Sequence, residues 1–216
     1  MNNWIDLYNL LKGNYEEEPE HLLIEYIDLI DKGKVLDLGV GNGRNSLFLS
    51  AIGYDVEGVD ISDDNIKNYL EKSKELQLDV KGTVADIRKF EIKENEYSLI
   101  IVSWVLNFFR KNEIDYIIEK IKKGLRENGV VYFGAFSIFD DFYIKNLDKT
   151  CDEQYSLYFS KSGYRHYYTK EEVLKYFEDL KMIAFKSGMF LDVDKENGDH
   201  YHDGFEYVGK KIKNVK

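Results

Sequence analysis

The stretch VLDLGVGNGRN, residues 35–45, decides the fold. It begins within KVLDLG (34–39), a short and almost wholly apolar run that predicts a strand covered on both faces. It ends in a predicted helix at 44–52, and the turn between them holds three glycines: Gly39, Gly41 and Gly43. Glycine permits a left-handed backbone and lets the main chain come close to a ligand. Because ligands bind beyond the carboxyl ends of strands in open α/β sheets, this turn predicts a binding site.

Outward from this turn, strand and helix patterns alternate along the chain. Further strands are predicted at 55–60, 80–86, 97–104 and 130–136, and helices at 63–76, with Ser62 as N-cap, and at 112–125. Two last strands, in 181–193 and 202–212, are predicted to join around Asn197-Gly198 as an antiparallel hairpin. The alternation predicts a Rossmann-like α/β fold, with a mostly parallel sheet and helices on both faces.

The 216 residues are predicted to form a single domain. Pro19 is expected in the first turn of a helix that runs to Ile30, and Thr169 with Glu172 has the capping-box spacing at the start of the last helix. The predicted parts are an N-terminal helical cap (1–32), a cofactor-binding core (33–137), an aromatic-rich insertion expected to act as a lid (138–168), and the last helix with the terminal hairpin (169–216).

Composition narrows the class of protein. The net charge is −10 and the lysines alternate with acids, which argues against nucleic acid or an anionic membrane as partner. The single cysteine, Cys151, cannot form an internal disulfide and fits a reducing compartment. Neither a signal-peptide pattern nor an apolar run of about 18 residues is present, so we expect a soluble, cytoplasmic protein.

The spacing of the glycines discriminates between cofactors. A dinucleotide fingerprint, G-x-G-x-x-G, would need a third glycine where Arg44 stands. Asp37, two residues before the first glycine, suits a ligand with an ammonium group and would repel a pyrophosphate. Asp60 ends the second predicted strand, where it can accept hydrogen bonds from a ribose, and Asp86 ends the third, where it can accept one from adenine. Together they predict a site for a positively charged nucleoside.

Residues 34–107 resemble the class I S-adenosylmethionine-dependent methyltransferases. VLDLGVGNGRN is similar to their first motif, GVDIS to their second, VADIRKF to their third, and YSLIIVSWVLNF to their fourth strand with the loop beside the substrate. The resemblance implies a seven-stranded sheet with a terminal hairpin and S-adenosylmethionine as cofactor. It assigns Asp37 and the glycine loop to the methionine part, Asp60 to the ribose, Asp86 and Ile87 to the adenine, and Ser103 and Trp104 to the gap between cofactor and acceptor. Asn42, Arg44, Asn45 and Ile61 complete the implied cofactor site.

A narrower resemblance is to the tellurite-resistance methyltransferases, relatives of the thiopurine S-methyltransferases. It rests on GNGRNSLFLSAIGYDVEGVD and on DVDKENGDHYHDGFEYVGKK. The chain departs from that family at Val40, where a cysteine is usual, and in the hairpin, where histidines and acids replace a basic residue. The implied acceptor is a small molecule: a thiol, a chalcogen oxyanion or another small nucleophile.

Three histidines are candidate general bases for such an acceptor: His166 in the insertion, and His200 and His202 in the terminal hairpin. His200 and His202 lack an evident third ligand, so no metal site is expected. Two alternatives remain at this point, a non-catalytic protein that binds the nucleotide for regulation and, less favoured, a nicotinamide-dependent oxidoreductase. The sequence does not indicate an oligomeric state.

Overall fold

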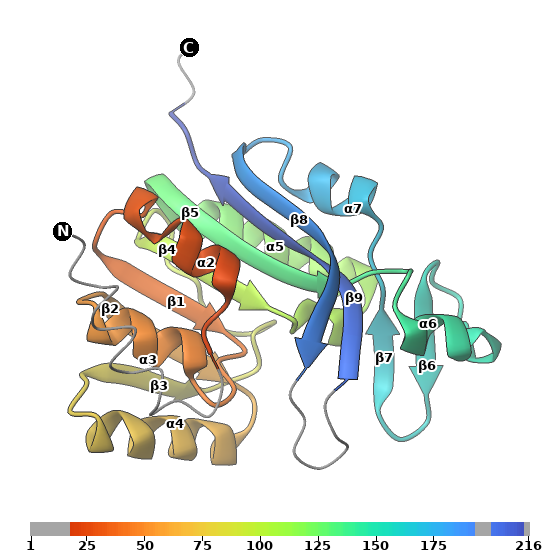
Figure 1. Ribbon diagram of the computed structural model, residues 1–216, viewed down its shortest axis with the longest axis horizontal. Coiled ribbons are helices and arrows are strands. Elements are labelled where there is room, and N and C mark those ends of the chain that lie inside the picture. Colours follow the sequence, from red (N-terminus) through yellow and green to blue (C-terminus); the bar gives the residue numbers. More distant parts are fainter. Residues whose placement is uncertain (1–17, 193–199, 214–216) are drawn as a thin grey trace.

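The computed structural model describes residues 18–192 and 200–213. Its main sheet has seven strands in the order β3-β2-β1-β4-β5-β9-β8. Five strands are parallel, and β9 runs antiparallel to both of its neighbours (Figure 1). The bounds are β1 Lys34–Leu38, β2 Asp55–Asp60, β3 Val80–Val84, β4 Tyr97–Ser103, β5 Leu125–Phe136, β8 Lys181–Asp192 and β9 His200–Lys210. The predicted Rossmann-like sheet with a terminal hairpin is therefore confirmed.

Helices cover both faces of this sheet. Apolar side chains of α2 (His21–Glu25) and α3 (Arg44–Ala51) pack with Val35, Leu99 and Tyr132 on one face, which we call the α2 face. On the opposite face, α5 (Lys111–Gly124) and α7 (Lys170–Tyr176) pack with Phe133 and Ala135. Figure 1 shows α5 behind the sheet and α2 and α3 in front of it, with α4 (Asp63–Glu75) beside β3. Successive residues of β5 thus point to opposite layers.

The first helix differs from the sequence prediction. The helix expected to run to Ile30 ends at Glu25 and continues as the 3-10 helix η1 (Ile27–Leu29), and Pro19 precedes the N-cap Glu20 instead of lying in the first turn. The tighter turn brings Ile27 and Ile30 into the same core as three residues of α2, Leu22, Leu23 and Ile24. A single apolar stripe along one α-helix could not bury all five side chains.

The insertion (138–168) has its own secondary structure. It forms α6 (Asp141–Lys145), the 3-10 helix η3 (Leu147–Lys149) and a two-stranded sheet of β6 (Ser156–Phe159) and β7 (Gly163–His166). In Figure 1 these elements stand at the side of the main sheet next to β9. The predicted turn at Asn197-Gly198 lies outside the described residues. Across the described ranges, no helix has both the length and the apolar content to cross a membrane.

The predicted N-cap of α4 is formed. The Ser62 side chain accepts a hydrogen bond from the Asn65 amide at 3.2 Å, and Asp63 and Asp64 occupy the first turn. We expect Ser62→Ala to lower the free energy of unfolding by about 1 kcal/mol, because one amide of the first turn loses its acceptor. Ser62→Asn is the matched control and should unfold like the wild type in urea. Equal stability of Ser62→Ala and wild type would contradict this role.

Candidate functional site

Backbone hydrogen bonds fix the glycine turn to the neighbouring strand. The amides of Gly39 and Val40 donate to the Val59 carbonyl at 2.7 and 3.0 Å. Gly41 donates its amide to Asp60 Oδ2 at 3.0 Å, and the other Asp60 oxygen accepts the Ser62 amide at 2.9 Å. The buried Asp60 carboxylate therefore holds the turn open at the carboxyl end of β2.

The three glycines serve different purposes, although all have positive φ angles, of 81°, 55° and 85°. A Cβ atom at Gly39 would lie 2.7 Å from Val105, and one at Gly43 would lie 2.3 Å from Tyr69. A Cβ at Gly41 would meet nothing within 4 Å. Gly39 and Gly43 are thus required by packing, whereas Gly41 faces open space that a ligand can fill.

Asp37 lies beneath this turn and is almost fully buried, at 3% exposure. Its Oδ2 accepts a hydrogen bond from the Ser46 hydroxyl at 2.8 Å. Burial raises the pKa of Asp37 to about 7, and the carboxylates of Asp60 and Glu20 oppose its ionisation further, while Ser46 and Arg44 favour it. The charge of this group therefore changes close to neutral pH.

Glu20 belongs to the same site, although no sequence motif indicated it. One oxygen, Oε1, accepts hydrogen bonds from Ser103 Oγ and Trp104 Nε1, each at 2.7 Å, and from the Arg44 guanidinium. The Glu20 amide donates to Asn45 Oδ1 at 2.9 Å. Glu20 thus joins the residues predicted on the glycine loop to those predicted at the end of β4. Its partners lie up to 84 positions away along the chain, so no local pattern could reveal them.

Trp104 forms an aromatic wall on the α2 face. Its backbone is left-handed, with φ of 57°, and its amide donates to the Gly134 carbonyl at 2.8 Å. The indole covers Gly134 and Gly204, where a Cβ would approach it to 3.2 and 2.7 Å. Its ring lies 5.3 Å from that of Phe136 and 5.2 Å from that of Phe190. Glycines at 134 and 204 therefore make room for this wall.

His202 and His200 lie beside the aromatic wall. The His202 ring is 4.5 Å from the Phe136 ring, and its Nδ1 is 2.7 Å from Asp140 Oδ2. The Nε2 atoms of His200 and His202 are 3.1 Å apart. These two predicted candidates thus approach the same face as Trp104.

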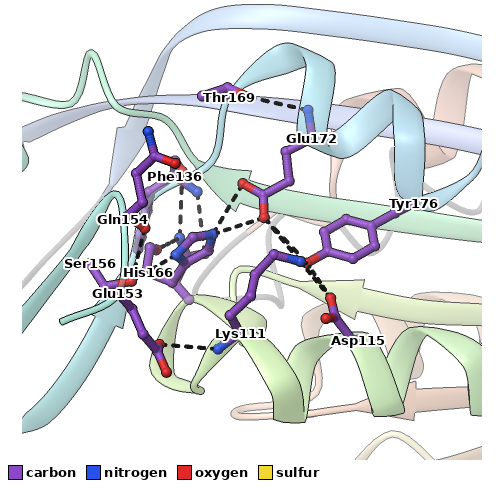
Figure 2. Close-up of polar contacts among 11 residues, drawn as sticks. Lys111, Asp115, Phe136, Glu153, Gln154, Ser156, His166, Thr169, Glu172 and Tyr176 are labelled. Atoms are coloured by element: carbon purple, nitrogen blue, oxygen red, sulfur yellow. Dashed lines mark hydrogen bonds and ion pairs between the residues drawn. The ribbon is translucent and has the colours of Figure 1, made fainter.

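His166 lies on the opposite face, in the layer of α5 and α7. Its ring is 2% exposed and packs against Tyr168, a member of the α5 and α7 core. Nδ1 contacts Ser156 Oγ at 2.9 Å and Nε2 contacts Glu172 at 3.1 Å, as Figure 2 shows. The ring thus packs with the layer of α5 and α7, whereas Trp104 packs with Phe136 and Phe190, so the geometry offers no support for a catalytic role of His166.

Glu172 completes only half of the predicted capping box. Its amide donates to Thr169 Oγ1 at 3.2 Å, but its carboxylate turns to His166 and to Lys111, whose Nζ is 3.5 Å away. The cluster drawn in Figure 2 borders a cavity of about 800 Å³ that is lined by residues of α5 and α7. The Glu172 carboxylate therefore pairs with His166 and Lys111 and not with the N-cap amide.

The remaining predicted cofactor residues lie near the ends of β2 and β3. Ile61 is 70% exposed and Ile87 is buried. The Asp86 carboxylate is held by its neighbour Arg88, through Nε at 2.9 Å and Nη2 at 2.6 Å, and this pairing lowers the pKa of Asp86. Asn42 is half-buried, and its Oδ1 accepts the Arg44 amide at 3.2 Å. An adenine amino group would therefore share Asp86 with Arg88.

Comparisons with known proteins agree with the resemblance stated above. The family model described as "Tellurite resistance protein TehB" matches residues 5–187. The chain is 30% identical over 158 residues to the probable S-adenosyl-L-methionine-dependent methyltransferase TehB of Haemophilus influenzae, which covers 73% of the chain and 52% of that protein. The chain thus spans about half the length of the curated TehB relatives that it matches.

Solved structures share the fold. The crystal structure of TehB from Haemophilus influenzae superposes with a TM-score of 0.72 at 24% identity, covering 93% of this chain and 65% of that one. A SAM-dependent methyltransferase from Methanosarcina mazei gives 0.74 at 18% identity, covering 91% and 99%. The predicted methyltransferase fold is therefore confirmed.

The open space at Gly41 generates a prediction for cofactor binding. Gly41→Val should abolish the binding of S-adenosylhomocysteine while the protein stays folded, because the side chain enters space that packing leaves open. Gly53→Val is the matched control, since Gly53 has a φ of 90° and its Cβ would also meet nothing within 4 Å. Calorimetry should show binding by Gly53→Val and none by Gly41→Val, with similar thermal midpoints. Retained binding by Gly41→Val would show that the site lies elsewhere.

Proposed function

Since the chain belongs to the tellurite resistance protein TehB family, we propose that it transfers the methyl group of S-adenosylmethionine to a small acceptor in the cytoplasm. The observation that carries this proposal is the open space at Gly41, whose amide binds Asp60, next to a charged cluster of Asp37, Glu20 and Arg44. The single cysteine fits the reducing compartment.

The charges of the site complement those of the cofactor. S-adenosylmethionine carries two positive groups, the sulfonium and the ammonium, and one carboxylate. The site offers carboxylates at Asp37, Asp60 and Glu20 and one guanidinium at Arg44. All the donors around Glu20 meet at Oε1, and no described residue donates to Oε2. We assign Arg44 to the carboxylate of the methionine part, and Glu20 Oε2 and Asp37 to its positive groups.

The nucleoside part fits the ends of β2 and β3. Each oxygen of the Asp60 carboxylate accepts one hydrogen bond from a backbone amide. Since a carboxylate oxygen can accept two, both oxygens can still accept a hydrogen bond from a ribose diol. Ile61 presents its exposed side chain next to it, as an apolar surface for the sugar and base. Asp86 and Ile87 are proposed to border the adenine.

Methyl transfer requires the protein to align the acceptor with the methyl group more than to activate the acceptor. The bound cofactor supplies an electrophilic methyl group, and the protein brings the acceptor in line with it, which removes the entropy cost of their meeting. The wall of Trp104, Phe136 and Phe190 is an apolar surface for the acceptor. A thiolate needs no base, whereas a protonated acceptor does, and His202 and His200 are the candidates on this face.

Calorimetry tests whether the bound cofactor is S-adenosylmethionine or a nicotinamide dinucleotide. We expect S-adenosylmethionine and S-adenosylhomocysteine to bind and NAD to bind little or not at all, because Arg44 replaces the third glycine of a dinucleotide site. Labelled S-adenosylmethionine should then methylate at least one member of a panel of dithiothreitol, tellurite, selenite and a phenol. Binding without any turnover would favour the regulatory alternative, and equal or tighter binding of NAD would sink the proposal.

The pKa of Asp37 predicts how cofactor affinity depends on pH. Because the pKa is raised to about 7, the carboxyl is mostly protonated at pH 6 and ionised at pH 8. A positively charged ligand favours the ionised form, so the affinity for S-adenosylmethionine should rise by up to about fivefold from pH 6 to pH 7. Asp37→Asn is the control and should bind weakly with a flat profile over that range. An identical rise in wild type and Asp37→Asn would exclude Asp37 as its cause.

A further inference from the structure

A buried tyrosine hydroxyl lies beneath the glycine turn. Tyr69 of α4 is 0% exposed, and within the described ranges its hydroxyl has no hydrogen-bond partner. Its ring supports the turn, because a Cβ at Gly43 would lie 2.3 Å from it and one at Gly58 would lie 2.9 Å from it. That packing needs only the ring, and a phenylalanine would provide it equally well. The hydroxyl calls for a separate explanation, since a buried O–H without an acceptor is destabilising.

Two polar groups of the site, Ser46 and Asp37, lie close to this hydroxyl. Burial raises the pKa of Tyr69 well above its usual range, the Ser46 hydroxyl opposes this rise, and the Asp37 carboxylate adds to it. Ser46 is itself fully buried, and its hydroxyl donates to Asp37 Oδ2 at 2.8 Å. Because that bond uses the hydrogen of Ser46, its oxygen can still accept one. Tyr69 is thus placed to donate to Ser46.

The two oxygens of the Asp37 carboxylate have different surroundings. Oδ2 accepts the Ser46 hydroxyl, whereas no described residue donates to Oδ1. The titratable and charged groups that face Asp37 are Arg44 of α3, Asp60 of β2, Glu20, and Tyr69 of α4. Only Arg44 among them is positive, and two are carboxylates that oppose a third negative charge. Hydrogen-bond donors therefore matter for the ionisation of Asp37.

We propose that Ser46 and Tyr69 are positioning residues that act on the cofactor through Asp37. When Asp37 is ionised, the Tyr69 O–H donates to Ser46 Oγ and the Ser46 O–H donates to Asp37 Oδ2. Oδ1 is then left for a positive group of S-adenosylmethionine. Each hydroxyl polarises the next, which strengthens the bond to the carboxylate and keeps it charged and fixed in orientation. The proposal rests on the methyltransferase function proposed above.

Carbon-13 spectra of the ligand-free protein test this chain of hydrogen bonds. The aspartate carboxyls are labelled, Asp37 is assigned with Asp37→Asn, and its chemical shift is followed from pH 5 to pH 9. We expect a midpoint near 7 in the wild type. Ser46→Ala should raise the midpoint by about one pH unit or more, because the ionised carboxylate loses its donor. Tyr69→Phe should also raise it, by less than Ser46→Ala does.

The matched controls remove the same chemical groups elsewhere. Ser50→Ala removes a hydroxyl one turn further along α3, which donates to a main-chain carbonyl at 3.1 Å. Tyr54→Phe removes a buried hydroxyl of the α2 face, which donates to a main-chain carbonyl at 2.8 Å. Both controls should keep the wild-type midpoint. An unchanged midpoint in either Ser46→Ala or Tyr69→Phe would overturn the proposal.

The affinity for S-adenosylmethionine tests the consequence. If the midpoint rises by one pH unit, Ser46→Ala should bind about fivefold more weakly than the wild type at pH 7, but less than about twofold more weakly at pH 8.5. Comparison at the same pH cancels the titration of the cofactor's own ammonium group. A variant that only disturbs the packing of the turn loses affinity by the same factor at both pH values. That result in calorimetry would refute the role of Ser46.

The two experiments separate this proposal from the proposed function. Failure of S-adenosylmethionine to bind the wild type would contradict the proposed function. The carbon-13 titration uses no ligand, so it would still decide whether Ser46 and Tyr69 act on Asp37.

Discussion

The hydrogen bonds from the Gly39 and Val40 amides to the Val59 carbonyl are the constraint on which the site depends. They continue the parallel pairing of β1 with β2 for one step beyond the strand, so the chain must turn directly over the sheet edge. That turn places the Gly41 amide on Asp60 and starts α3 at Arg44. Arg44 in turn reaches Glu20. The residue at which β1 ends thus determines where each charged group around the proposed cofactor site lies.

Sequence patterns correctly predicted the elements that depend on residues close together along the chain. The strand at 55–60 has the predicted bounds, and Ser62 caps α4 as its spacing indicates, since an N-cap involves residues three positions apart. The same reasoning missed Glu20, whose partners Ser103 and Trp104 are brought to it only when β4 lies beside β1. It also misjudged Glu172, whose carboxylate pairs with a buried histidine and not with the N-cap amide.

The three candidate histidines show that residue types alone do not define a site, because their side chains must also lie on the same face. The sequence made all three candidates for one role, but the structure divides them between two layers. Tyr167 contacts Phe136, whereas its neighbour His166 points toward Glu172 on the side of α5 and α7. His200 and His202 are two residues apart on β9, so their side chains point to the same face of the sheet. Which face a segment presents depends on register, and register is set by long-range pairing.

The insertion has a consequence for how the protein could diversify. The groups proposed for the donor come from α2, β1 to β4 and their connecting turns, whereas Asp140 and Tyr167 come from one contiguous stretch between β5 and α7. That stretch enters and leaves the main sheet within a short distance, since Ser137 forms a bridge with Tyr168. It is therefore an exchangeable module. Recombination at these two neighbouring positions would exchange the groups that contact His202 and Phe136 from the insertion as a unit, while the aromatic wall and the groups proposed for the donor stay in place.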